Sequence, residues 1–403
     1  MKKKLWIITE VFYPDETATS YILTKIAERL ADSFDVNVIC GPLDADCRIT
    51  SLPLNRNLQV SRCNHFAWNK NNLVTRLFRF IGISITLVLS SIKRVKRNDN
   101  VLIVTNPAPM LLLFSWLKCW KKFNLTILVH DVFPENTIAA RILKNEDSFI
   151  YHWFKRRFDR AYARADQLIV LGRDMKKVML EKITPYRIST PCIKIVENWA
   201  DVENIQPHSF DRNVFLGLNC SGKIIMQYAG NLGRVQGLME FLHCFYESRN
   251  PKLHLCIWGK GAIEMELKQY VKEHNITNVS FHGSYTRDMQ DKVLNSCDLA
   301  VVTLSEKMYG LGVPSKSYNI MAAGKPILYI GDPASEIAQT IHDKRIGISF
   351  PHEKRQLTTF LAELTLNDLP YLRELGQNAR ISAETDYAQS VILQKFTSCF
   401  ARI

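Results

Sequence analysis

The sequence predicts an α/β fold made of two Rossmann-like, doubly wound domains. Short apolar strands alternate with helix-length amphipathic segments, as in parallel sheets with crossover helices. The alternation stops once, at the polar, aperiodic stretch "ENWADVENIQPHSFDRNVFLGL" (197–218), and then starts again. With 403 residues, 47% of them hydrophobic, the chain is long enough for two cores. We predict domains over residues 1–204 and 205–403.

The first domain opens with a strand, loop, helix and strand. "KKLWIITEVF" is followed by the turn-rich "YPDETATS", the helical "YILTKIAERLADSF" and the strand "DVNVICG". Further strands are expected at 100–106, 125–131, 165–172 and 192–198. The carboxyl ends of parallel strands border the ligand crevice of an open sheet. The strand-end residues expected to face this crevice are Thr9, Glu10, His130, Asp131 and Asn198.

The second domain repeats the alternation. Strands are expected at 223–231, 252–261, 279–284, 298–304 and 325–331, with intervening helices such as 237–248 and 263–275. The last segment, residues 385–403, includes the amphipathic "DYAQSVILQKFTSCFARI". We expect this helix to cross back to the first domain.

Charge is distributed unevenly along the chain. Residues 1–200 carry 31 Lys and Arg against 18 Asp and Glu, whereas residues 201–403 carry 21 of each, so the first half accounts for the net charge of +13. Between Thr50 and His130, 12 basic residues accompany a single acid, Asp99. This asymmetry predicts that the first domain faces an anionic surface.

Apolar runs lie among these cations. "FIGISITLVLSSI" (80–92) has arginines and lysines on both sides, and "PMLLLFSWLKCW" (109–120) precedes two lysines. A run of 13 uncharged residues is shorter than the roughly 20 that span a bilayer. It is either a buried helix of the domain or a helix at the membrane interface, and the adjoining charge favours contact with an anionic membrane. Nucleic acid ranks last as a partner, because aliphatic rather than stacking aromatic residues separate the cations.

The opening segment and the cysteines predict a cytoplasmic chain. After "MKKK" only "LWII" precedes Thr9, too short for a secretory signal. The ten cysteines show no CxxC pair and no histidines at metal spacing, so we interpret them as reduced core thiols. Asp44 and Asp46 form a D-x-D in a loop, interpreted as solvated. We predict no metal and no cofactor.

Glycine-rich turns follow the strands of the second domain. They read "GNLGRVQG", "GKG", "HGSY" and "GLGVPSKSYNIMAAGKP". A single glycine pair usually marks only a tight turn, and none of these is a complete G-x-G-x-x-G. As a set they offer backbone N–H groups and helix starts to a phosphate.

Together these segments resemble the retaining glycosyltransferases of family 4, which have the GT-B fold. The similar motifs are "HDVFPEN" (130–136), "IVENWAD" (195–201), "YAGNLGRVQG" (228–237), "WGKGAIEMELK" (258–268) and "VPSKSYNIMAAGKPIL" (313–328). Within the family the chain looks like the bacterial O-antigen and capsule transferases of the L-fucosamine-transferase type. The resemblance implies two domains facing across a cleft, with a nucleotide sugar bound by the second and the acceptor by the first.

The resemblance also implies roles for individual residues. His130 matches the histidine expected to hydrogen-bond the transferred sugar, and Asp131 and Glu135 either orient the acceptor hydroxyl or serve the structure. Thr17, Thr19 and Ser20 stand where the family has paired glycines and either bind a phosphate oxygen or cap a helix. Expected donor-binding residues are Gly230, Asn231, Gly233, Gln236, Gly259, Lys260, Gly261, His282, Gly283, Pro314, Ser315 and Asn319, with Asn198 and Trp199 at the hinge or cleft.

The chain departs from the family at the diphosphate grip. Relatives carry an arginine and a lysine where this sequence has Asn231 and Gln236, which leaves Arg234 and Lys316 as the candidate catalytic cations. Relatives also carry two glutamates eight residues apart. The matching positions are Leu311 and Asn319, so one carboxylate is missing unless Glu306 replaces it.

We therefore predict a retaining, metal-independent hexosyltransferase. It would move a sugar from a UDP donor, with an N-acetylated amino sugar as one option, to a polyprenyl-diphosphate-linked saccharide at the inner face of the cytoplasmic membrane. No carboxylate pair indicates double displacement, so front-face attack would give retention. One alternative is a nucleotide-sugar 2-epimerase, which needs no acceptor. Another is a non-catalytic nucleotide-sugar-binding assembly subunit, suggested by the missing family residues.

Overall fold

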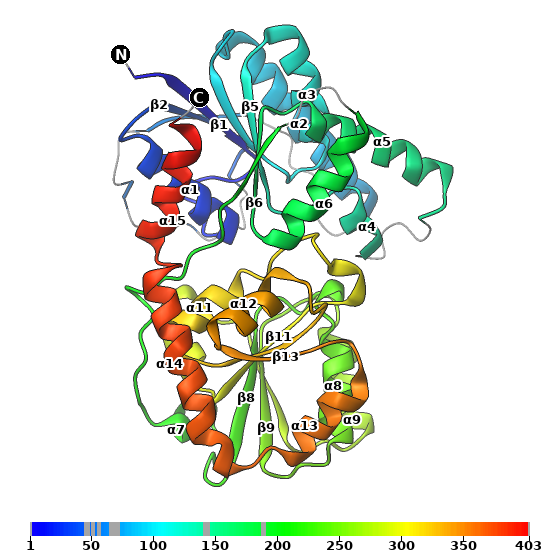
Figure 1. The fold of residues 1–403 in the computed structure, drawn as a ribbon, viewed down its shortest axis with the longest axis vertical. Coiled ribbons are helices and arrows are strands. Elements are labelled where there is room, and N and C mark those ends of the chain that lie inside the picture. Colours follow the sequence, from blue (N-terminus) through cyan, green and yellow to red (C-terminus); the bar gives the residue numbers. More distant parts are fainter. Residues whose placement is uncertain are drawn as a thin grey trace. The chain divides into compact units, whose positions relative to one another are not determined.

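A computed structural model describes residues 2–43, 49, 53–54, 58–63, 73–139, 146–186 and 191–401. The chain divides into two compact units, each with one sheet and its own helices (Figure 1). Unit 1 comprises residues 1–137, 143–196 and 393–403, and unit 2 comprises residues 138–142 and 197–392. The α/β class with two doubly wound domains is confirmed.

Unit 1 contains a parallel sheet in the order β3-β2-β1-β4-β5-β6-β7. The strands are β1 (Lys4–Thr9), β2 (Asp35–Cys40), β3 (Gln59–Arg62), β4 (Asn100–Val104), β5 (Asn124–Val129), β6 (Gln167–Val170) and β7 (Cys192–Ile195). The chain runs outward from β1 to one side and later continues from β4 to the other. Ligands of such sheets bind at this switch point, beyond the carboxyl ends of β1 and β4.

The helices of unit 1 follow its strands. They are α1 (Ala18–Leu30), α2 (Leu73–Arg94), α3 (Pro109–Lys121), α4 (Glu135–Ala139), α5 (Phe149–Ala163) and α6 (Arg173–Ile183), with a 3-10 turn at Thr184–Tyr186. The helix α2 contains the apolar run 80–92 and buries Ile83, Leu87 and Val88. Within the described part of the chain, no helix is both long enough and apolar enough to cross a bilayer.

Unit 2 contains a second parallel sheet, in the order β10-β9-β8-β11-β12-β13. Its strands are β8 (Ile224–Ala229), β9 (Leu253–Trp258), β10 (Val279–Gly283), β11 (Leu299–Thr303), β12 (Ile327–Ile330) and β13 (Gly347–Phe350). The switch point lies between β8 and β11. The helices are α7 (Arg212–Leu216), α8 (Leu238–Glu247), α9 (Glu264–Glu273), α10 (Gln290–Asn295), α11 (Lys316–Ala322), α12 (Glu336–Lys344), α13 (Lys354–Glu363) and α14 (Leu369–Thr385).

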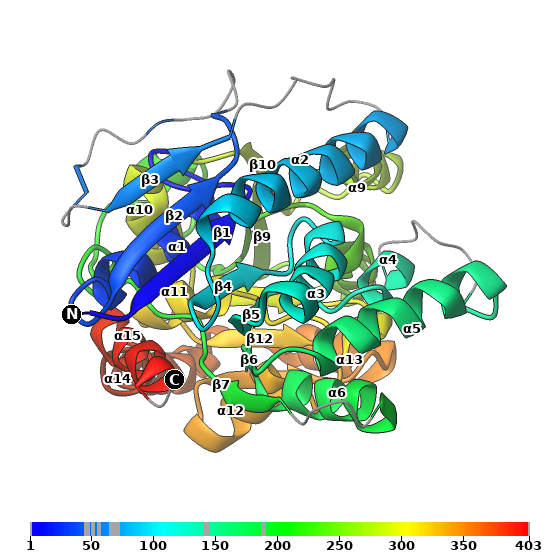
Figure 2. The same ribbon diagram turned by 90° about the horizontal axis from the view of Figure 1, so that it is seen from above.

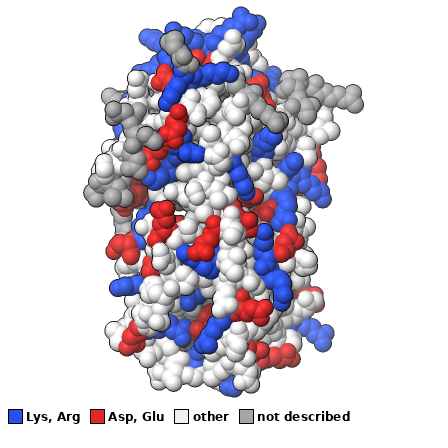
Figure 3. All heavy atoms as spheres, turned by 60° about the vertical axis from the view of Figure 1, so that its left-hand side comes forward, with Lys and Arg blue, Asp and Glu red and all other residues white. Residues whose placement is uncertain are grey.

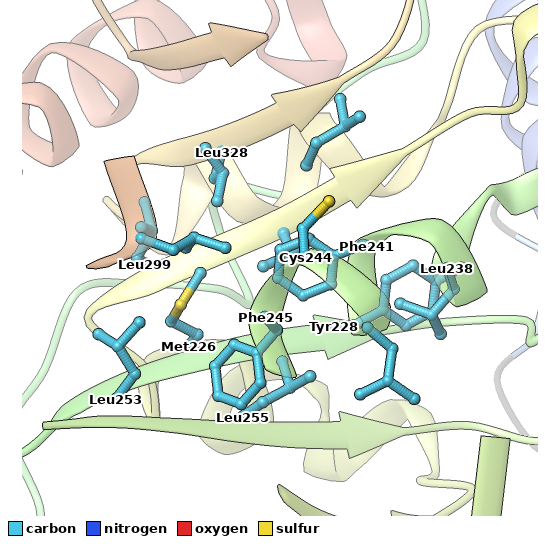
Figure 4. Close-up of a cluster of buried hydrophobic side chains, with 14 of the residues drawn as sticks. Met226, Tyr228, Leu238, Phe241, Cys244, Phe245, Leu253, Leu255, Leu299 and Leu328 are labelled. Carbon is cyan, nitrogen blue, oxygen red and sulfur yellow. The ribbon is translucent and has the colours of Figure 1, made fainter. Parts of the chain in front are cut away.

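The core of unit 2 explains why its strands read as continuous apolar runs. Every residue of β8 and β9 is buried, because helices cover both faces of the sheet. On one face, Met226 and Tyr228 of β8 and Leu255 of β9 pack with Phe241 and Phe245 of α8 (Figure 4). This packing fixes β8, whose last residue leads into the first glycine turn.

The last helix, α15 (Gln389–Phe400), begins in unit 2 and ends in unit 1. Phe400 is buried and meets Phe34 edge-on, with ring centroids 6.1 Å apart. The Arg29 guanidinium donates to Gln394 Oε1 at 2.6 Å. Residues 393–403 therefore contribute to the packing of unit 1.

The cysteines correct one prediction. Cys119 and Cys192 are exposed, so these two are not core thiols, whereas the other described cysteines are buried. Cys47, Asp44 and Asp46 lie outside the described residues. Among the residues that the structure describes, no group of three or more His, Cys, Asp or Glu has the geometry to hold a metal.

Charge on the visible surface agrees with the sequence. On the face drawn in Figure 3, lysines and arginines gather at the upper end, while both signs alternate over the lower half. The mixed half corresponds to unit 2, most of which lies in residues 201–403, where the two signs are equally frequent.

Candidate functional site

In unit 2, the first glycine turn lies at the switch point of the sheet. The turn runs from Gly230, after β8, to Gly237, where α8 begins. The Ser305 N–H, just after β11, donates to Val235 O at 3.0 Å. A Cβ on Gly237 would lie 3.2 Å from Leu304 O. The turn and the loop after β11 therefore pack together where a ligand of this sheet is expected.

The glycines of neighbouring turns permit close approach of the backbone. A Cβ on Gly259 would lie 1.9 Å from Gly230 O, and one on Gly261 would lie 2.4 Å from Leu232 O. Gly230 N–H donates to Trp258 O at 3.0 Å, and Gly259 N–H donates to Gly283 O at 2.6 Å. The sheet thus brings together four of the glycines predicted to bind the donor.

Lys316, the first residue of α11, extends its amine to this turn. Its Nζ is 3.6 Å from the centre of the Tyr228 ring and 3.2 Å from the place of a Cβ on Gly230. The Nζ atom is shielded from solvent and has no hydrogen-bond partner among the described residues. Burial lowers the pKa of Lys316 to about 7. An ammonium on an aromatic face without a counter-anion is a site that an anion would stabilise.

Tyr228 also forms hydrogen bonds to the glycine turn. Its hydroxyl donates to Asn231 O at 2.8 Å and to Gln236 Oε1 at 3.3 Å. The two residues that replace the family's cations are therefore engaged in shaping the turn. Arg234 lies between them, exposed, and within the described chain its side chain makes no hydrogen bond or ion pair.

His282 forms a stacked surface at the end of β10. Its ring centroid lies 4.5 Å from that of Trp258 at an interplanar angle of 16°, and Trp258 also stacks with Phe215 at 5.7 Å and 21°. His282 Nε2 is 2.8 Å from Ser280 Oγ. Burial lowers the pKa of His282, so the ring is neutral at pH 7.

The remaining predicted residues of unit 2 differ in exposure. Asn319 Oδ1 accepts from the Asp201 N–H at 3.0 Å. Lys260, Ser315 and Glu306 are exposed, and replacement of the missing carboxylate by Glu306 stays a prediction. Gly233 and Pro314 are half-buried, and Asn198 and Trp199 are buried in the segment that pairs at Ala200 with Ala388.

In unit 1, a buried threonine positions the loop after β5. Thr105 Oγ1, just beyond β4, accepts from the N–H groups of His130 and Asp131, both at 3.1 Å. His130 Nε2 is buried and has no hydrogen-bond partner among the described residues. Burial lowers the pKa of His130 to about 4. A neutral imidazole with a free ring nitrogen suits hydrogen bonding to a substrate better than charge stabilisation.

Glu135 lies in a network of ion pairs rather than free in the loop. Its carboxylate contacts the amines of Lys155 and Lys182, each at 2.6 Å, and both lysines also contact Asp159. Burial alone would raise the pKa of Glu135, but the two ammonium groups outweigh it and lower that pKa. Asp131 instead accepts from Asn136 Nδ2 at 3.0 Å, and burial raises the Asp131 pKa.

Sequence reasoning missed the other three members of this network, Lys155, Lys182 and Asp159. Lys155 and Asp159 have the i,i+4 spacing of a helical ion pair, which is a weak local signal. Lys182 is 47 residues from Glu135, and only the packing of α6 beside α5 brings it there. The network holds the start of α4, and with it the segment that carries His130.

The β1–α1 loop shows helix capping. Thr17 is the N-cap of α1, and its side chain accepts from the Ser20 N–H at 3.3 Å. The Ser20 hydroxyl is buried with no hydrogen-bond partner in the described chain, and Thr19 is half-buried. The capping role is thus present, while phosphate binding stays a prediction.

Comparison with known proteins assigns the family. A family model described as glycosyl transferases group 1 matches residues 216–382. Over 399 residues the chain is 32% identical to the probable glycosyltransferase WbjE of Pseudomonas aeruginosa, covering 98% of this chain and 97% of the other. The chain belongs to the group 1 glycosyltransferases.

Solved structures share the fold of this group 1 glycosyltransferase. HepE of Anabaena, in complex with UDP and glucose, gives a TM-score of 0.72 at 14% identity over 100% of both chains. WaaG, a glycosyltransferase involved in lipopolysaccharide biosynthesis, gives 0.67 at 13% identity over 99% of this chain and 100% of its own.

The glycine contacts predict a difference between two substitutions. Gly259→Ala places a methyl group against Gly230 O at a φ of 132°, whereas Gly283→Ala at a φ of 72° meets no atom within 4 Å. We expect Gly259→Ala to lower the free energy of unfolding by about 2–5 kcal/mol and Gly283→Ala by about 1 kcal/mol. Urea denaturation measures both. Equal losses would contradict the close approach.

The ion-pair network predicts a second difference. Lys182 and Lys155 contact the same two carboxylates, but their side chains are 3% and 36% exposed. Lys182→Met removes the buried cation that pairs with the carboxylates of Glu135 and Asp159. We therefore expect the free energy of unfolding to fall by about 3–5 kcal/mol. Lys155→Met should cost about 1 kcal/mol or less, because solvent screens that amine. Denaturation midpoints of the two variants check this ranking.

Proposed function

We propose that this glycosyltransferase transfers a sugar, with retention, from a UDP donor to a polyprenyl-diphosphate-linked saccharide in surface polysaccharide synthesis. The observation that carries the proposal is the Lys316 amine, buried without an acceptor at the glycine turn of the switch point. The UDP complex of HepE supports the donor class. The involvement of WaaG in lipopolysaccharide biosynthesis supports a surface polysaccharide as the kind of product.

The diphosphate would lie over the turn between Gly230 and Gly237. Lys316 supplies a desolvated cation, Arg234 a solvent-exposed one, and the turn supplies backbone N–H groups. Negative charge accumulates on the diphosphate as the glycosidic bond breaks, so these groups stabilise the transition state more than the ground state. With two cations on the leaving group, we propose transfer without a metal ion.

Retention would proceed by attack on the face that the diphosphate leaves. The bond from the acceptor oxygen to the anomeric carbon forms as the bond from that carbon to the diphosphate breaks, and the leaving phosphate takes the hydroxyl proton. The salt bridges of Glu135 argue against its use as a nucleophile. The neutral His130 would hydrogen-bond a sugar hydroxyl, and Asp131 would orient the acceptor.

The acceptor's lipid tail would keep the enzyme at a membrane. The excess of basic residues in the first half of the sequence supports association with anionic lipids. We place the enzyme peripherally on the inner face of the cytoplasmic membrane, with acceptor binding assigned to residues 1–204 and donor binding to residues 205–403. An N-acetylated amino sugar is the donor sugar suggested by the resemblance to L-fucosamine transferases.

Removing either cation should slow transfer. Arg234→Ala and Lys316→Ala should each reduce kcat/KM for transfer from a UDP-sugar to a polyprenyl-diphosphate saccharide by about 100-fold. The matched control is Lys252→Ala. Lys252 is exposed and precedes the amino end of β9, whereas the glycine turns follow the carboxyl ends of the strands. Full activity in both variants would refute the diphosphate assignment.

The same assay separates the alternatives. A UDP-sugar isomer formed from the donor without acceptor would identify a 2-epimerase. Donor that binds but is never transferred to lipid extracts would identify a non-catalytic subunit. Screening UDP-sugars by thermal shift before the assay selects the donor for this test.

Lys316 also predicts how UDP affinity changes with pH. Because the pKa of Lys316 is lowered to about 7, the free protein loses this ammonium as the pH rises above 7, and binding of an anion must restore it. UDP affinity should therefore fall between pH 7 and pH 9, by at most about tenfold per pH unit. Two buried histidines of unit 2 lose their charge below this range, since burial lowers the pKa of His254 to about 4 and also lowers that of His282.

Calorimetric titration with UDP measures this dependence. Lys316→Met should bind more weakly at pH 7 and show a flat profile. A wild-type profile that is equally flat would show that Lys316 does not meet the diphosphate.

A further inference from the structure

Three helices of unit 1 lie side by side over one face of its sheet. Figure 2 shows α2, α3 and α5 in this order, and α3 packs against both of the others. Each helix buries one side against unit 1. The other sides carry ten exposed large hydrophobic residues: Phe78, Ile81, Ile85 and Leu89 of α2, Trp116 and Trp120 of α3, and Phe149, Ile150, Trp153 and Phe154 of α5. We call this set the three-helix apolar face.

The first turns of α5 are its most exposed part. Phe149 is 83% exposed and Ile150 61%, and Trp153 and Phe154 follow one helical turn later. The Arg157 guanidinium lies over the Trp153 ring at 5.1 Å. An exposed cluster of aromatic and aliphatic side chains backed by arginine matches the chemistry of the membrane interface, where aromatic rings sit at the level of the headgroups.

Exposed hydrophobic residues elsewhere do not gather in this way. On the described part of unit 2, the exposed large hydrophobic residues are Val214 of α7, Met265 of α9, Leu366 before α14, and Tyr371 and Ile381 of α14, so no helix carries more than two of them. Single exposed apolar residues are normal on a folded protein, whereas a contiguous group marks an interaction surface. The three-helix apolar face collects ten such residues on helices that pack side by side.

Charge on the same helices selects the partner. The sequences of α2, α3 and α5 contain one acid, Asp159, whose carboxylate Lys155 and Lys182 contact. Exposed basic residues border the face: Lys93, Arg94, Lys96, Arg97, Lys122, Arg156, Arg157 and Arg160. A partner for this surface must be both anionic and apolar. Nucleic acid lacks the apolar part, while an anionic bilayer presents both.

We propose that the three-helix apolar face docks on an anionic bilayer, with the first two turns of α5 inserted among the headgroups. This deepens the membrane part of the proposed function and goes beyond the segments around 80–92 and 109–120, because it assigns insertion to α5. It is independent of the donor chemistry of unit 2.

The same helix ties the membrane surface to the candidate acceptor segment. Further along α5, Lys155 contacts Glu135, the first residue of α4. The segment with His130 and the inserted turns would thus be held at a fixed separation within unit 1. A hydroxyl on a lipid-linked saccharide needs such a fixed height above the headgroups to be reached reproducibly.

Vesicle flotation of the full chain tests the proposal. Wild-type protein should float with vesicles of phosphatidylglycerol and phosphatidylcholine, much less with phosphatidylcholine alone, and less as salt increases. Phe149→Ser/Ile150→Ser/Trp153→Ser should reduce the bound fraction on anionic vesicles at least tenfold. The matched control, Val214→Ser/Met265→Ser, removes two residues of unit 2 that are 78% and 75% exposed and should float like wild type.

Two further readouts keep the test decisive. Unchanged melting temperature and UDP binding in the α5 variant would show that its loss is not a folding defect. Transfer to a water-soluble acceptor analogue reports the sugar chemistry separately, so failure of the proposed function would appear there and not in flotation.

Two results would overturn the proposal. One is flotation of the α5 variant equal to that of wild type. The other is a wild-type dimer in light scattering that becomes a monomer in the α5 variant, with no lipid binding by either protein, because the face would then cover a second copy of the chain.

Discussion

The candidate donor site depends on the contact between the backbones of Gly259 and Gly230. Only a residue without a Cβ leaves room for this approach, and the approach sets where the turn after β8 lies. With the turn in this position, the Lys316 amine lies over the Tyr228 ring, 3.6 Å from its centre. A buried amine without an acceptor is costly, so its persistence at a glycine turn is best understood as preparation for an anion. The free-energy cost of burying the Lys316 ammonium without an acceptor would be offset when that anion binds.

Much of the architecture could be predicted from the sequence, because buried parallel strands read as apolar runs that end in glycine or polar residues. β8, with its following turn, is an example. What could not be predicted is the environment of side chains brought together over long sequence separations. Arg234 lies within the turn itself, yet it is exposed, whereas the buried cation comes from Lys316, which follows three further strands of the sheet along the chain. Similarly, Thr105, which positions His130, carries no signal in a sequence read locally.

The environments of side chains in the candidate acceptor segment could not be predicted either. Glu135 lies within the motif "HDVFPEN" (130–136), but its carboxylate belongs to an ion-pair network. The most buried member of this network, Lys182, is 47 residues away. The apolar character of α5 was also hidden, because "FIYHWFKRRF" mixes aromatic and basic residues and has no apolar run. Only its packing decides that Tyr151 and Phe158 point inward while Phe149 and Trp153 point outward. Periodicity predicts that a helix forms, and the neighbouring α3 and α6 determine which side is left uncovered.

The two halves of α5 carry different features, a salt-bridge network and the surface proposed to dock on a membrane. An inserted helix experiences forces from the bilayer, and a helix held only by apolar contacts can slide along its neighbours, because dispersion contacts are non-directional. The pairs from Lys155 and Lys182 to Glu135 and Asp159 are directional, and they are satisfied at one register of α5 against α4 and α6. The network thus fixes the position of Phe149 relative to His130 within unit 1. Besides stabilising unit 1, the network would keep the candidate acceptor segment at a constant height above the lipid if α5 docks on a bilayer as proposed.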